Sequence, residues 1–88
     1  MELYDEIENS FQIIEKWFSK ENLQEFKDTP VSDLYLYHFG LGIWIRNDLL
    51  NPQKSHLYDL FSENGIEHQD DMSSLIINQF HEYISNKI

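Results

Sequence analysis

Apolar residues recur at helical spacing along most of the chain, and no segment shows the alternating pattern of a strand. Over residues 2–18 they follow one another at steps of three or four, which predicts an amphipathic helix. Ser19 is placed to cap a short second helix over residues 20–27. Residues 55–64 have the same period and end at Gly65, a residue suited to the end of a helix. Asp70 or Asp71 is expected to be the N-cap of a last helix. The pattern predicts an all-α protein of about five helices.

The third of these helices is expected over residues 30–49, which include the most apolar part of the chain. Thr29 followed by Pro30 is typical of an N-cap with proline at the first helical position. Gly40 and Gly42 lie inside this segment and point about 160° apart on a helix. Glycine is unfavourable inside a helix, so two of them indicate close neighbours on two sides. We therefore expect residues 30–49 to be the central buried helix of a compact bundle.

Charge divides the chain into three parts. The net charge is −10, from 16 acidic residues against 6 lysines and arginines. Residues 1–28 carry eight acids and three lysines, residues 29–54 are neutral, and residues 55–88 carry six acids and one lysine. Such a surface repels phosphate backbones and anionic membranes and attracts basic partners. The absence of a basic patch argues against nucleic-acid binding.

Length and composition indicate one helical domain, residues 1–88. The chain has no cysteine, so neither disulfides nor thiolate metal sites stabilise it. Its first five residues include two acids and no base, whereas a secretory signal begins with basic residues. The longest apolar run, residues 39–45, is far shorter than a membrane span. We expect a cytoplasmic protein that binds neither a membrane nor a cofactor.

Arg46 is the only arginine of the chain and adjoins its most apolar run. A planar guanidinium at such a place indicates a need for a bidentate donor. We expect an internal clamp in which Arg46 pairs with Asp70 or Asp71 and fixes the last helix to the central one. The alternative is that Arg46 binds the carboxylate or phosphate of a ligand, in a notch that Gly42 opens beside His38.

His38 and His68, together with Asp70 and Asp71, would supply two imidazoles and two carboxylates, which are ligands for zinc, iron or manganese. Their spacing lacks the i, i+4 histidine pair of a helical metal motif. The chain also has no Gly-x-Ser-x-Gly elbow. We therefore expect no metal and no catalytic residue, with a small enzyme or metal-binding protein built on these residues and Arg46 as the alternative. The two other histidines, His56 and His81, are expected at the surface or its boundary.

Two motifs carry a resemblance to a known family. The string His-Phe-Gly-Leu-Gly-x-Trp-Ile-Arg-Asn spans residues 38–47, and His-x-Asp-Asp-Met-Ser spans residues 68–73. As a pair they resemble an uncharacterised family of small bacterial proteins, over roughly residues 30–85. Gln69 stands where that family has proline. The resemblance implies a bacterial source and implies that the two motifs form one spatial unit, but it implies no activity, cofactor or catalytic residue.

Carboxylates of the fourth helix offer a candidate surface for a partner. Asp59 and Glu63 share one helical face, and Glu67 follows just beyond it, with Tyr58 beside them. Interfaces favour tyrosine, and acidic surfaces attract basic proteins. By analogy, small acidic helical proteins of this kind include immunity proteins and antitoxins, and we expect an inhibitor of a basic, nuclease-like toxin. The alternatives are a solubilising acidic coat and a homo-oligomer formed through aromatic residues.

Overall fold

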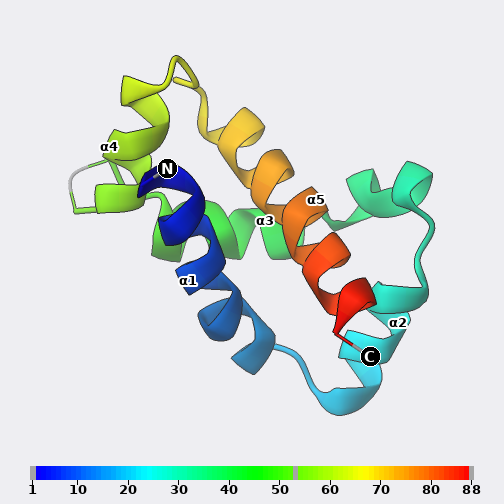
Figure 1. The fold of residues 1–88 in the computed structure, drawn as a ribbon. Helices are drawn as coiled ribbons and strands as arrows, with labels where there is room; N and C mark the ends of the chain where they lie inside the picture. Colours follow the sequence, from blue (N-terminus) through cyan, green and yellow to red (C-terminus); the bar gives the residue numbers. More distant parts are fainter. Residues whose placement is uncertain (1, 53, 88) are drawn as a thin grey trace.

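The computed structural model describes residues 2–52 and 54–87, and no strand occurs among them (Figure 1). The expected all-α fold is therefore confirmed. The elements are α1 (Glu2–Lys16), α2 (Lys20–Asp28), the 3₁₀ helix η1 (Val31–Tyr37), α3 (Leu41–Trp44), the π-helical turn η2 (Ile45–Leu49), α4 (His56–Glu63) and α5 (Gln69–Asn86). They form one body of 34 × 25 × 22 Å. None of these helices is both long and apolar enough to cross a membrane.

The ends of α2 and α4 follow from local sequence signals. The Ser19 hydroxyl accepts a hydrogen bond from the Asn22 backbone N–H at 3.1 Å, which caps α2. In the same way Ser55 accepts from the backbone N–H of Tyr58 at 3.0 Å and caps α4. After α4, Gly65 has a φ of 86°, a conformation that favours glycine because it has no Cβ. The predictions for Ser19 and Gly65 are confirmed, and the cap at Ser55 is an additional finding of the structure.

The helix at the centre of the molecule is α5. It contacts α1, α2, α4 and all three parts of the segment that contains η1, α3 and η2. Figure 1 shows it, yellow to red, crossing the molecule between α1 and α2. Its Phe80 ring lies 5.7 Å from the Phe11 ring of α1 and 5.5 Å from the Phe26 ring of α2, measured between centroids. The core thus forms around α5, whose buried apolar residues are Met72, Ile76, Ile77, Phe80 and Ile84.

The expectation of one buried central helix over residues 30–49 is wrong. The segment divides into η1, α3 and η2, and its hydrogen bonds change from a 3₁₀ to an α and then to a π pattern. At its end the backbone N–H of Leu50 donates to the oxygen of Ile45, five residues earlier, at 3.1 Å. Leu34, Leu41 and Ile45 enter the core. Other large apolar residues of the same segment stay exposed, among them Val31, Tyr35 and Phe39.

Thr29 does not cap the helix that follows it. Its backbone N–H donates to the oxygen of Phe26 at 3.1 Å, and its hydroxyl donates to the oxygen of Glu25 at 2.9 Å. Thr29 therefore satisfies acceptors at the end of α2. Pro30 then precedes η1 in an extended conformation, with φ −59° and ψ 147°, and supplies no side-chain cap.

Helix α5 begins earlier than expected, with its cap at residue 68 instead of at residue 70 or 71. His68 occupies the cap position and makes no side-chain capping hydrogen bond. Asp70 and Asp71 lie inside the first turn, where carboxylates interact favourably with the helix dipole. The aspartates thus favour this helix end by charge instead of by capping. The expectation that one of them is the N-cap is wrong.

Two histidines contact residues that are far from them in the sequence. His56 Nε2 lies 3.1 Å from Glu2 Oε1 on the surface, as expected for an exposed histidine. His81 was expected at the surface or its boundary, but it is buried, with 8% of its surface exposed. Its Nε2 donates to the backbone oxygen of Lys27 at 3.1 Å, and its ring packs against Phe26. A buried imidazole is stable there because the end of α2 offers it an acceptor.

Candidate functional site

Arg46 lies where the end of η1, the turn η2 and the start of α5 meet. Its Nη1 donates a hydrogen bond to Ser73 Oγ at 3.0 Å, and its Nη2 donates to the backbone oxygen of His38 at 3.3 Å. Nη1 also lies 3.6 Å from Asp70 Oδ1. The contact expected between Arg46 and Asp70 is present, and residues 38–47 and 68–73 form one spatial unit around the guanidinium.

The strength of this clamp comes mainly from Ser73, a residue that the sequence did not single out. The Arg46 side chain is 15% exposed, but the Asp70 side chain is 72% exposed, so water screens their attraction. Ser73 is fully buried and also donates to the backbone oxygen of Asp70 at 3.1 Å. Its spacing, one turn after Asp70 on the core-facing side of the helix, was the signal that could have identified it.

The notch beside Gly42 is filled by the protein itself. A Cβ placed on Gly42 would lie 3.0 Å from Arg46 Nη1, so glycine is what allows the guanidinium to lie against this backbone. Gly40 is different, because a Cβ there would meet nothing within 4 Å. The expectation that both glycines are closely flanked is therefore wrong for Gly40 and correct for Gly42.

The other members of the proposed ligand set are only partly brought together. His38 Nε2 lies 3.9 Å from Asp70 Oδ1. His68 and Asp71 are exposed, and neither makes a side-chain hydrogen bond or ion pair with a described residue. Within residues 2–52 and 54–87, no three histidine, aspartate or glutamate side chains are grouped so that they could hold a metal ion. Because Arg46 directs its donors at protein atoms, this arrangement is suited to joining segments of the chain.

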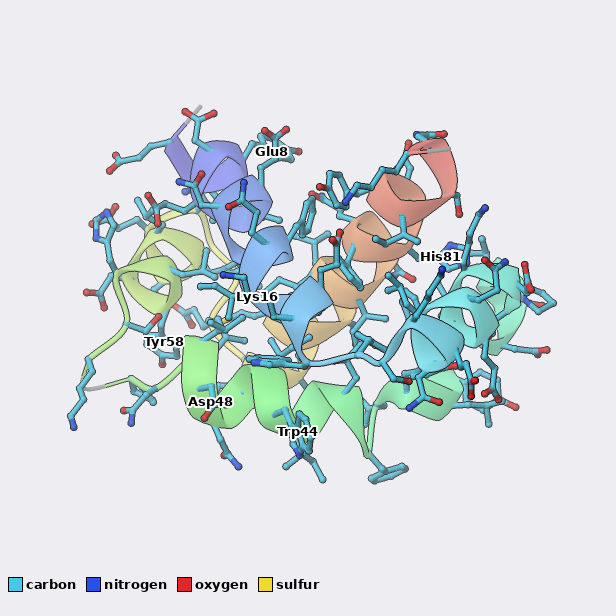
Figure 2. All side chains as sticks on the ribbon, turned by 90° about the horizontal axis from the view of Figure 1, so that it is seen from below. Glu8, Lys16, Trp44, Asp48, Tyr58 and His81 are labelled. Atoms are coloured by element: carbon cyan, nitrogen blue, oxygen red, sulfur yellow. The ribbon has the colours of Figure 1, made fainter. Side chains whose placement is uncertain are left out.

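The carboxylates proposed to meet a partner lie on the outside of α4 and beyond it. Asp59 and Glu63 are both exposed, one helical turn apart, and Glu67 is exposed in the connection to α5. Tyr58 is partly buried against the core, so only part of its side chain is accessible (Figure 2). This surface is open to a second molecule. Figure 1 shows α4 and η1 on opposite sides of the protein.

Large apolar side chains are exposed along η1 and α3, and the sequence interpretation missed them. We call this surface the apolar ridge. Residues 31, 35, 39 and 43 recur at every fourth position, while residues 34, 41 and 45 form a second apolar stripe, and only one stripe can face α5. That double stripe was the available signal. Figure 2 shows Trp44 on the outer side of this segment. The ridge consists of Val31, Tyr35, Leu36, Phe39, Ile43 and Trp44, which are 70%, 70%, 63%, 78%, 40% and 55% exposed.

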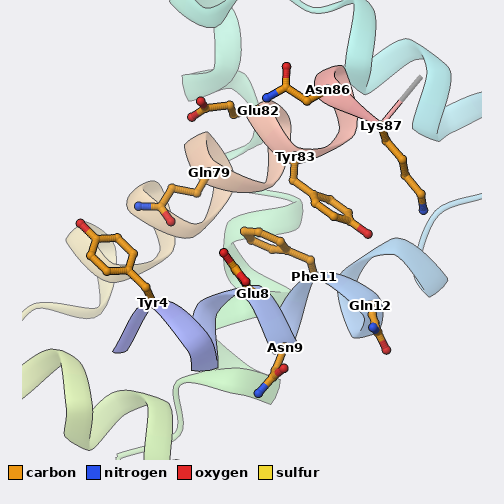
Figure 3. A pocket seen from close by; sticks show the side chains of 10 residues that line it. All are labelled: Tyr4, Glu8, Asn9, Phe11, Gln12, Gln79, Glu82, Tyr83, Asn86 and Lys87. Carbon is orange, nitrogen blue, oxygen red and sulfur yellow. The ribbon is translucent and has the colours of Figure 1, made fainter. Parts of the chain in front are cut away.

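A broad groove of about 760 Å³ runs between α1 and α5 (Figure 3). The rings of Phe11 and Tyr83 meet in it, with centroids 5.0 Å apart. Amide and carboxylate side chains line the rest, including Glu8 and Glu82. Lys87, at one end, is drawn to Glu15, with its Nζ 2.7 Å from Oε1, and this hydrogen bond raises the pKa of Lys87 above 10.5. The groove therefore presents a polar rim with an aromatic floor.

Comparison with known proteins identifies a family. Residues 5–84 match the family described as "Domain of unknown function (DUF6794)". No curated protein and no solved structure matches the chain.

Proposed function

The chain belongs to the DUF6794 family, and we propose that it acts by binding a basic partner protein. The observation that carries this proposal is the apolar ridge. Monomeric proteins rarely expose several large apolar side chains together, and such surfaces mark places where other molecules dock. Aromatic side chains such as Tyr35, Phe39 and Trp44 are also enriched where proteins meet.

The partner is basic because of the net charge of the whole chain. The chain carries a net charge of −10, and the exposed carboxylates of α4 add to a negative field on the far side from η1. Such a field steers a cationic protein toward the surface, and the ridge then supplies the buried contact area. The ridge thus governs how long a complex lasts, and Asp59, Glu63 and Glu67 govern how fast it forms.

The most concrete form of this function is an immunity-protein or antitoxin-like inhibitor, whose target is a basic toxin such as a nuclease. A small acidic inhibitor imitates the charge of a nucleic acid and shields the basic surface of its target. The alternative, a small enzyme or metal-binding protein, receives less support, since Arg46 is engaged by Ser73 and the backbone of His38.

A capture experiment with matched variants tests the binding function. The immobilised chain, a ridge variant (Tyr35→Ser with Phe39→Ser) and a control variant (Tyr4→Ser with Ile13→Ser) are exposed to a lysate of the source organism. The control residues are also exposed, at 52% and 46%, but lie outside the ridge. We expect a basic protein on the wild type and the control, and an affinity lowered by about thirtyfold or more in the ridge variant, the loss typical of a central interface residue.

The captured protein is then purified and its binding kinetics are measured. Asp59→Lys with Glu63→Lys should slow association by about tenfold or more at low salt. Glu21→Lys with Glu82→Lys changes the net charge equally but away from α4, and should slow association less. The association rate of the wild type should fall by a similar factor when the salt concentration is raised to near 0.5 M, where the screening length is about 4–5 Å. A neutral or acidic partner, or equal affinities of the ridge and control variants, would refute the binding function.

Growth measurements test the inhibitor form separately. Cells that express the captured protein alone should stop growing, and co-expression of this chain should restore growth. The ridge variant should fail to restore it. If the captured protein is harmless alone, the inhibitor form is wrong, while the binding function is judged by the affinities.

A further inference from the structure

An aromatic pocket of about 400 Å³ lies where the end of α1, the helix α2 and the segment around α3 meet. Both tryptophans of the chain line it, Trp17 from the end of α1 and Trp44 from α3. Their rings approach edge to face, with centroids 6.0 Å apart. Trp44 also belongs to the apolar ridge, so the pocket opens within the surface that we assign to the partner. The other lining residues are Phe18, Asn22, Glu25, Tyr37, Gly40 and Leu41.

The inner walls of the pocket are held by the core. The Phe18 ring lies 5.5 Å from that of Phe26 and 6.0 Å from that of Phe80. Tyr37 meets Phe26 edge to face at 4.8 Å, and its hydroxyl lies 3.4 Å from Thr29 Oγ1. The rings of Phe18 and Tyr37 are therefore fixed before any ligand arrives, and a ligand does not have to order them.

Glu25 is the one charged side chain among the residues that line this pocket. It is exposed, and its carboxylate makes no hydrogen bond or ion pair with any residue in 2–52 or 54–87. The lysines of α2 lie elsewhere: Lys20 and Lys27 border another hollow of the surface, which they share with Lys87. Lys16, next to Trp17 in the sequence, is not among the lining residues. The pocket thus combines several aromatic rings with one uncommitted negative charge.

We propose that this pocket takes an arginine side chain of the basic partner, a step that rests on the proposed function. Cations are attracted to the faces of tryptophan and tyrosine, and arginine is the cation most often found there. Its planar guanidinium stacks on aromatic rings and also forms paired hydrogen bonds with a carboxylate, here that of Glu25. A second copy of this chain does not fit, because both copies are acidic and Arg46, the sole arginine, is held by Ser73.

Capped arginine (N-acetyl-arginine methylamide) and its neutral isostere, capped citrulline, test this proposal on the whole chain. Because both tryptophans line the pocket, the two indole N–H signals in a ¹H–¹⁵N NMR spectrum report on it directly. We expect arginine at millimolar concentration to shift both signals with saturation, and citrulline to bind at least about threefold more weakly. Capped lysine should fall between them because it lacks the planar fork.

Two variants of α2 locate the charge that matters. Glu25→Gln should weaken arginine binding by about three- to tenfold and leave citrulline binding unchanged. Glu21→Gln removes a carboxylate from the same helix outside the pocket and should leave both unchanged. Backbone amide spectra confirm that each variant is folded. Equal binding of arginine and citrulline, unchanged binding in Glu25→Gln, or indole signals that do not move would each overturn the proposal.

Binding measurements with the captured partner distinguish a failure of the arginine site from a failure of the proposed function. If Glu25→Gln and wild type bind the basic partner equally while the ridge variant does not, the arginine site is wrong and the binding function stands. If arginine binds the pocket but the captured partner is not basic, the binding function fails while the pocket retains its preference. If the arginine site and the binding function are both correct, Glu25→Gln should weaken partner binding by about the same factor as it weakens arginine binding.

Discussion

Replacing Gly42 with alanine tests whether glycine is there to admit the Arg46 guanidinium. The new Cβ would lie 3.0 Å from Nη1, closer than carbon and nitrogen atoms normally approach, so the guanidinium has to move. The movement is resisted because Nη1 donates to Ser73 Oγ at 3.0 Å and Nη2 donates to the His38 oxygen at 3.3 Å. A shift of a few tenths of an ångström lengthens at least one of these hydrogen bonds.

The size of the effect follows from two opposing contributions. Alanine in place of a helical glycine stabilises by about 0.5–1 kcal/mol. A hydrogen bond of a charged group contributes about 1.5–3 kcal/mol, and its loss also leaves the buried Ser73 hydroxyl with fewer partners. We therefore expect Gly42→Ala to destabilise the protein by about 1–2 kcal/mol. For a domain of this size that lowers Tm by roughly 4–16 °C.

Urea unfolding followed by circular dichroism measures the change, with Gly40→Ala as the matched control. A Cβ on Gly40 meets nothing within 4 Å, so this variant should be neutral or more stable by up to about 1 kcal/mol. In an Arg46→Met background the clash is absent, and Gly42→Ala should then stabilise. If Gly42→Ala destabilises equally with and without Arg46, the guanidinium is not the reason for glycine at this position.

Two other predictions concern contacts between distant parts of the chain. His81→Phe should preserve the packing against Phe26 but leave the Lys27 oxygen without its donor, at a cost of about 1–3 kcal/mol in urea unfolding; an unchanged midpoint would show that water replaces the imidazole. The hydrogen bond to Glu15 raises the pKa of Lys87 above 10.5 in the folded state, so its stabilising effect is present below pH 10.5 and lost as pH rises through the raised pKa. The difference in urea midpoint between wild type and Glu15→Gln should therefore shrink above pH 10.5, and a constant difference would contradict the assignment.

Local signals in the sequence predicted most helix boundaries but not which helix is central. Ser19, Ser55 and Gly65 act on their own immediate backbone, so their roles could be identified from neighbouring residues alone. The choice between α5 and residues 30–49 as the central helix depends on which apolar stripes find a partner in three dimensions. Residues 30–49 have two such stripes, and apolar composition alone made both of them candidates for burial.

The contacts of Arg46 were likewise predictable from the sequence only in part. A lone arginine beside an apolar run indicated a need for acceptors, and the contact with Asp70 follows from that need. The two stronger partners are a serine hydroxyl and the backbone oxygen of His38. Serine inside a helix commonly bonds to a backbone oxygen of the preceding turn, as Ser73 does to that of Asp70, and a backbone oxygen has no sequence signature at all. Neither of these two partners could therefore be identified from the sequence alone.

The order in which the chain is synthesised determines when the contacts between α1 and α5 can form. The apolar face of α1, which includes Ile7, Phe11 and Ile14, is covered in part by α5, and Glu15 meets Lys87 across 72 residues of sequence. During synthesis the N-terminal part emerges first. Because α5 contacts every other element, the core cannot close until that helix has left the ribosome. Until α5 is synthesised, α1 therefore lacks its contacts with that helix, and the core stays incomplete.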